Sequence, residues 1–145
     1  MYALAAGVPA FGQGMADHHG GASPGKPGDP AKVSRSIEIT MDDTMRFTPD
    51  TIKVKAGETI RFNITNTGKL PHEWVIGTME HLKEHAETMR KMPGMAHHRE
   101  PNMMNLEPGK SGSIVWEFGT AGTVDFACLV PGHMEAGMAG KVVVE

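Results

Sequence analysis

Cysteine is almost missing from this chain: among 145 residues only Cys128 carries a thiol, which excludes an internal disulfide. Basic runs and clusters that mix aromatic with basic residues are also missing, and the formal net charge is only -3. These absences argue against a nucleic-acid-binding protein. No apolar stretch reaches the roughly 20 residues that a membrane-spanning helix needs, so we expect no membrane span.

Methionine and histidine are abundant by comparison, with 12 and 8 residues. Together with the single thiol they supply thioether, imidazole and thiolate groups, the ligand types that suit copper. In an exported protein a lone thiol is exposed to oxidation. Cys128 is therefore either buried and inert or bound to a metal.

The first 32 residues differ in composition from the remainder of the chain. Residues 1–14 are small and mostly apolar and resemble the end of an export signal, with a disordered tail as the alternative. Residues 17–32 are rich in Gly and Pro, and His18 and His19 are either solvated there or bind metal weakly. We expect a signal remnant and flexible tail over 1–32, a single domain over 33–145, and a periplasmic or otherwise exported protein.

Alternating apolar residues predict short strands from about residue 33 onward. Ile60, Phe62 and Ile64, for example, alternate with polar residues, as in a sheet with one wet face. Comparable runs begin near residues 36, 51, 72, 113, 124 and 142. Seven or so short strands with turns between them predict an all-β, antiparallel β-sandwich.

One segment, at about residues 78–109, interrupts this pattern and reads as a Met/His-rich insertion. Its first part predicts a helix, in which Glu87 can pair with Arg90 or Lys91, and Pro93 ends it. We expect the rest, as far as Gly109, to be loop. The methionines in it, which include Met89, Met92, Met95, Met103 and Met104, either pack on the sandwich or form an additional Cu(I) site.

Residues 128–138 bring thiolate, imidazole and thioether onto one loop between two strands. Cys128 has the parity of Val124 and Phe126, so its sulfur should point into the sandwich. Pro131 and Gly132 predict a turn that directs His133 back towards that sulfur. Two imidazoles, one thiolate and a weak axial Met form the arrangement of a blue-copper site. His72 is the best candidate for the second imidazole.

The chain resembles the cupredoxin family at these residues. The pattern C-x4-H-x4-M, from Cys128 to Met138, is similar to the rusticyanin and auracyanin ligand loop. The pattern F-x-P-x-x-I-x-V-x-x-G-x-x-I-x-F, from Phe47 to Phe62, is similar to the N-terminal half of the family. The Met/His-rich insertion, with PHEWVIG before it, further resembles the cupredoxins of periplasmic copper resistance. The resemblance implies a Greek-key β-sandwich and one type 1 copper ion. It implies four copper ligands: His72, Cys128, His133 and Met138.

Each ligand has an alternative interpretation. Cys128 can be an ordinary buried thiol, and His72 a histidine at a strand edge. Met134 can be the axial group in place of Met138, although it follows His133 directly and should point away from a metal that His133 faces. Zinc is a poorer fit than copper because it prefers further Cys, His or carboxylate ligands. Glu73 departs from the family, where Asn or Ser often follows the first His.

The function expected from these residues is copper tolerance or handling with a redox-active mononuclear copper. The alternative is a dedicated electron carrier between respiratory partners. We expect a monomer that binds copper ions, with a redox partner protein as a further option. We expect no enzyme, because the sequence has no His-x-His pair and no His beside Cys128, both of which a multicopper oxidase needs.

Overall fold

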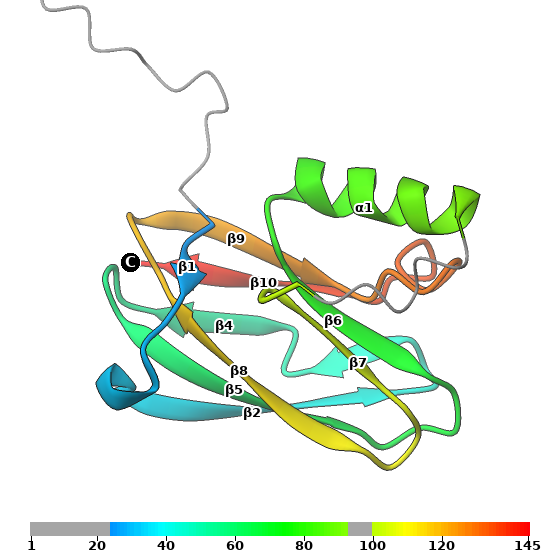
Figure 1. Ribbon diagram of the computed structural model, residues 1–145, viewed down its shortest axis with the longest axis horizontal. Coiled ribbons are helices and arrows are strands. Elements are labelled where there is room, and N and C mark those ends of the chain that lie inside the picture. Colours follow the sequence, from blue (N-terminus) through cyan, green and yellow to red (C-terminus); the bar gives the residue numbers. More distant parts are fainter. Residues whose placement is uncertain (1–23, 93–99) are drawn as a thin grey trace, which may run out of the picture.

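Two five-stranded sheets pack face to face in the computed structural model, which describes residues 24–92 and 100–145 (Figure 1). One sheet contains β1 (Lys26–Pro27), β8 (Ser111–Glu117), β5 (Thr59–Asn66), β2 (Arg35–Asp42) and β3 (Arg46–Thr48), in that order. The other contains β4 (Thr51–Val54), β10 (Ala139–Val144), β9 (Gly122–Ala127), β6 (His72–Gly77) and β7 (Met103–Leu106). The signal-like segment, His18, His19 and Met95 lie outside the described residues.

The apolar residues of both sheets meet in one core, as their alternation predicts. Phe62 of β5 contacts Trp74 of β6, with ring centroids 5.1 Å apart. Phe47 and Phe126 meet edge to face at 5.2 Å, a favoured arrangement of aromatic rings. The predicted β-sandwich is confirmed, and its core includes Cys128 and Met138, two of the candidate ligands.

Two strand pairs run parallel, β2 with β5 and β4 with β10, whereas the other pairs are antiparallel. Alternation along one strand is the same in both arrangements, because side chains alternate between faces either way. The sequence pattern therefore predicts the strands without their relative direction.

Three short strands, β1, β3 and β7, lie where the sequence predicts none, and β3 pairs with β2. Lys26 and Pro27, expected in a flexible tail, pair with β8, and the Trp116 indole N–H donates to the Pro24 carbonyl at 2.6 Å. A 3₁₀ helix, Pro30–Lys32, follows. β7, expected as loop, pairs with β6. β1 and β7 are short and contain no β-branched residue, so pairing with a neighbour, rather than local preference, determines them.

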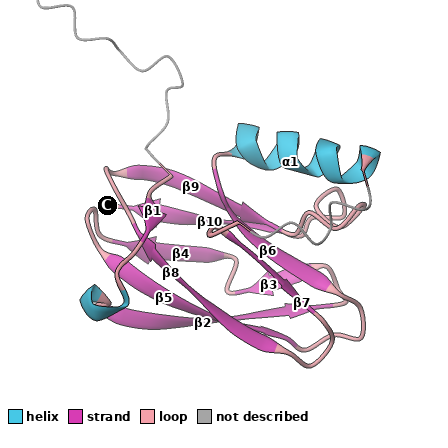
Figure 2. Cartoon of the chain, viewed as in Figure 1, coloured by secondary structure: helices cyan, strands magenta, loops and turns pink. Residues whose placement is uncertain are grey.

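The predicted helix is α1 (Met79–Lys91), which lies on the outer face of the β6–β9 sheet (Figure 2). The Thr78 side chain caps it by accepting a hydrogen bond from the His81 N–H at 3.1 Å. Glu87 pairs with Arg90 at 2.7 Å and with Lys91 at 3.5 Å, as expected. Within the described residues, no helix has the length and apolar character to cross a membrane.

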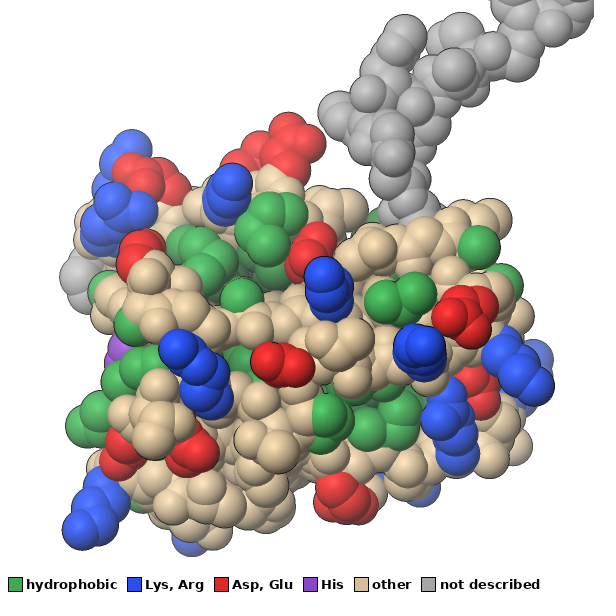
Figure 3. Space-filling model, turned by 180° about the vertical axis from the view of Figure 1, so that it is seen from behind, with side chains coloured by type: hydrophobic (Ala, Val, Ile, Leu, Met, Phe, Trp, Pro, Cys, Tyr) green, Lys and Arg blue, Asp and Glu red, His purple; other side chains and the backbone are tan. Residues whose placement is uncertain are grey.

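Acidic and basic side chains are interspersed over the face seen in Figure 3. Neither sign gathers in one region of this face, in keeping with the small net charge.

Candidate metal centre

Cys128 directly follows the last residue of β9 and is fully buried in the core between the sheets. The backbone N–H of Glu73 donates a hydrogen bond to its sulfur at 3.3 Å. Burial raises the pKa of the Cys128 thiol to about 11. A metal that binds this sulfur must therefore displace its proton.

The turn at Pro131 and Gly132 brings His133 back to this sulfur. The His133 N–H donates to the Val130 carbonyl at 2.9 Å, and Gly132 has a φ of +88°, the value that a type II turn needs at its third residue. As a result, His133 Nδ1 lies 3.4 Å from Cys128 Sγ. His133 is partly exposed, and its pKa is lowered by burial and by the nearby His72. The turn predicted from the sequence is confirmed.

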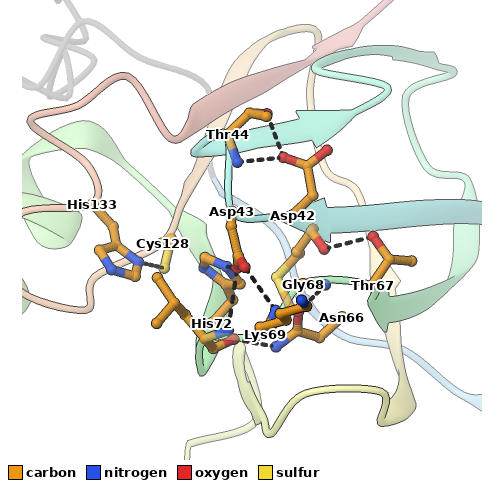
Figure 4. A network of polar contacts seen from close by, with 12 residues as sticks. Asp42, Asp43, Thr44, Asn66, Thr67, Gly68, Lys69, His72, Cys128 and His133 are labelled. Atoms are coloured by element: carbon orange, nitrogen blue, oxygen red, sulfur yellow. Dashed lines mark hydrogen bonds and ion pairs between the residues drawn. The ribbon is translucent and has the colours of Figure 1, made fainter.

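His72 begins β6, is buried, and is oriented by Asp43 (Figure 4). His72 Nε2 lies 3.0 Å from Asp43 Oδ1. The backbone N–H groups of Lys69 and Leu70, at 2.7 and 3.2 Å, hold the Asp43 carboxylate in place. The Lys69 bond, followed by that of His72, lowers the Asp43 pKa. An ionised carboxylate accepts only, so in a neutral His72 ring Nε2 carries the hydrogen and Nδ1 keeps a lone pair.

The lone pair on His72 Nδ1 has no hydrogen-bond partner in the described part of the chain, although the atom is buried. A buried nitrogen without a partner is costly unless something else binds it. One ligand atom each from His72, Cys128 and His133 lie within 4.8 Å of one another, and the two imidazole centroids are 5.0 Å apart. Metal bonds of roughly 2.0–2.3 Å fit the 3.4 Å between Cys128 Sγ and His133 Nδ1. The residues present therefore fit a metal with two nitrogen ligands and one sulfur ligand.

The two methionines of the loop lie in different surroundings. Met138 is fully buried in the same core cluster as Cys128, and its carbonyl accepts the Cys128 N–H at 3.1 Å. Met134 is partly exposed and packs against a second cluster, beneath α1. This second cluster lies on the other side of the sheet from Cys128, so only Met138 shares the core with the thiol.

Glu73 lies beside the centre with its side chain fully buried. Neither carboxylate oxygen has a hydrogen-bond partner among the described residues, and burial raises its pKa to about 7. Glu73 stands where many family members have Asn or Ser. It donates its backbone N–H to the Cys128 sulfur, whereas its side chain points away from that sulfur.

A nitrogen–nitrogen–sulfur site on a β-sandwich agrees with the comparison against protein families. Residues 33–145 match the model of the copper binding proteins of the plastocyanin/azurin family. The chain belongs to this family. It is thus a cupredoxin, as the resemblance of its ligand loop indicates.

Related proteins include two with the name Copper-resistant cuproprotein CopI. The protein from Rubrivivax gelatinosus is 54% identical over 120 residues, which cover 83% of this chain and 72% of the relative. The protein from Pseudomonas aeruginosa is 40% identical over 149 residues, covering 83% and 82%. Auracyanin B superposes with a TM-score of 0.67 at 22% identity, over 86% of this chain and 99% of its own, which is a likeness of fold.

The sequence of this cupredoxin predicted that His72, Cys128 and His133 form one site, and in the structure they lie side by side. The prediction missed Asp43, which lies 29 residues from His72 in the chain. No local pattern marks Asp43, because it lies in the turn between β2 and β3, where Asp is common.

Proposed function

We propose that this cupredoxin binds one type 1 copper ion and acts in copper tolerance. The proposed ligands are His72, Cys128, His133 and Met138. The observation that carries the proposal is the convergence of two imidazoles on a buried thiol within 4.8 Å. The two relatives with copper resistance in their names support the physiological part of the proposal.

Copper, when bound, supplies a one-electron couple between Cu(II) and Cu(I). The residues of this chain hold their positions through the fold: Cys128 and Met138 through the sheet, His133 through its turn, and His72 through Asp43. Such fixed ligands need little rearrangement when the charge of the metal changes. No substrate is transformed in this proposal, so the protein acts without being an enzyme.

Absorption spectroscopy during Cu(II) titration tests the centre. We expect a strong thiolate-to-copper charge-transfer band in the native chain and none in Cys128→Ala. Met138→Leu should shift the band and raise the reduction potential, because a weak ligand is lost. Met134→Leu, the matched control on the same loop, should change neither property. A band that persists in Cys128→Ala would rule out the assignment.

A dedicated electron carrier is the second candidate, favoured by the partly exposed ring of His133. Copper handling differs in that additional Cu(I) should bind at the Met/His-rich segment. We therefore propose to count Cu(I) per chain under anaerobic conditions. A single bound ion would indicate a carrier, and several ions would indicate copper handling.

We also propose that the protein is an exported monomer with a domain that begins near residue 33, where the family match begins. Cell fractionation and size-exclusion chromatography test these points. Retention in the cytoplasm or elution as a dimer would contradict them.

A further inference from the structure

The outer face of β6, opposite the copper site, carries a buried acid beneath α1. His72 and Trp74 point towards the core between the sheets, so the alternation of the strand directs Glu73 and Val75 to the outer face. Val75 packs there in the second cluster with Leu82 of α1. The Glu73 side chain is therefore enclosed between the sheet and the helix.

Three thioethers belong to the same cluster. Met89 comes from α1 and Met103 from β7, exposed by 6% and 9%, and Met134 packs against this cluster from the ligand loop. In the β6–β7 register Val75 lies opposite Met103, and Glu73 lies opposite Asn105. Met103 is thus the diagonal neighbour of Glu73 on one face, a separation that long side chains span.

A buried carboxylate with these neighbours lacks a compensating charge. Neither Glu73 oxygen accepts a hydrogen bond from residues 24–92 or 100–145, and an ionised carboxylate without a partner is strongly disfavoured in an apolar interior. A monovalent cation would leave the site neutral. Thioether sulfur selects soft ions, and Cu(I) is both soft and monovalent.

We propose that Glu73, Met89, Met103 and Met134 bind one Cu(I) ion on the face of β6 opposite the type 1 site. Met89 and Met103 also line a surface cavity of about 700 Å³ that is bordered by His72 and Pro131. This cavity gives an ion a route from solvent to the thioethers. The two metal sites would be separated by one strand, and Glu73 contacts both: through its carboxylate on one face and through its N–H to Cys128 on the other.

The test uses the full chain with Cys128→Ala, which removes the type 1 centre and isolates the second site. Cu(I) is titrated anaerobically in competition with a chromophoric Cu(I) chelator. Adding Glu73→Gln should remove one bound Cu(I) per chain or weaken its binding by at least about tenfold, because a buried charge loses its partner. Met103→Leu should act in the same direction. Met92→Leu is the matched control, since this thioether lies just beyond α1 and is 58% exposed.

Methyl NMR of labelled methionine gives a second readout that needs no change at Glu73. One equivalent of Ag(I), a redox-inert substitute for Cu(I), should shift the methyl signals of Met89, Met103 and Met134 and leave Met92 in place. Unmoved signals, or equal Cu(I) binding with and without Glu73→Gln, would overturn the proposal and leave Glu73 as a protonated acid among packing methionines. The charge-transfer band of the native chain tests the type 1 centre separately, so the two proposals can fail independently.

Discussion

Asp43 determines which nitrogen of His72 is available to a metal. Two backbone N–H groups hold the Asp43 carboxylate, so its orientation does not depend on its contact with the imidazole. A carboxylate that accepts from a ligating imidazole makes that ring a stronger electron donor, and this favours the higher oxidation state of the metal.

Replacing Asp43 with Asn should therefore raise the reduction potential of the copper centre. Loss of such a partner typically weakens metal binding by 10–100-fold. If only Cu(II) binding is weakened about tenfold, the potential rises by about 59 mV. Protein-film voltammetry measures this shift. Asp42→Asn is the control, because Asp42 bonds to Thr44 and not to His72; an equal shift in both variants would contradict a specific role for Asp43.

Also at the residue scale, most candidate ligands could be predicted from the sequence, whereas the residues that orient them, such as Asp43, could not. Cys128 and His133 lie five residues apart, so local turn chemistry brings them together. His72 and Asp43 meet only because the fold closes over 29 residues. The buried state of the Glu73 side chain likewise depends on α1 covering that face of the sheet.

At the scale of elements, Glu58 links the start of β2 to the turn between β4 and β5 through hydrogen bonds. It lies in the turn between β4 and β5 and accepts hydrogen bonds from Ser34 Oγ, Arg35 Nε and the Lys55 N–H at 2.7, 3.1 and 3.0 Å. Partial burial opposes ionisation, but these bonds outweigh it and lower the pKa of Glu58 to about 2.

Stability that depends on Glu58 should disappear in acid. Because the folded-state pKa of about 2 lies below the ordinary value of 4.5, the contribution is complete above about pH 4.5 and is lost as the pH falls towards 2. Glu58→Gln should lower the unfolding free energy at neutral pH by up to about 3 kcal/mol and flatten its decline in acid. Urea unfolding between pH 7 and pH 3 measures both effects. Glu107→Gln, at an exposed position, should change neither, and an unaltered acid slope in Glu58→Gln would refute the assignment.

Alternation of apolar and polar residues predicts a strand only when the strand is long enough to show it, which explains both the predicted and the missed strands. Long strands with a buried and a wet face, such as β5 and β8, show clear alternation. β1 and β7 have two and four residues, too few for a period to be visible. The parallel pairing of β2 with β5 depends on the path of the whole chain rather than on either strand.

At the scale of the whole molecule, copper binding should stabilise the fold. The proposed ligands come from β6 and from the loop between β9 and β10, so an ion that binds them bridges strands distant in the sequence. An ion present at 100 times its dissociation constant adds about 2.7 kcal/mol to the unfolding free energy.

We expect Cu(II) to raise the melting temperature of the native chain by several degrees. Cys128→Ala should show little of this shift, which differential scanning calorimetry with and without Cu(II) can measure. Equal shifts in the two proteins would indicate that stabilisation arises at a site other than the one centred on Cys128.

The base of the ligand loop is closed by the sheet itself. Ala127 pairs with Ala139, and the Cys128 N–H donates to the Met138 carbonyl at 3.1 Å, so both ends of residues 129–137 are fixed by the β9–β10 register. Insertions or deletions within those residues can leave the sheet register, Cys128 and Met138 in place while they move His133 relative to both. The length of this loop can therefore change, in evolution or by engineering, without a redesign of the sheets that carry it, whereas His72 stays fixed on β6.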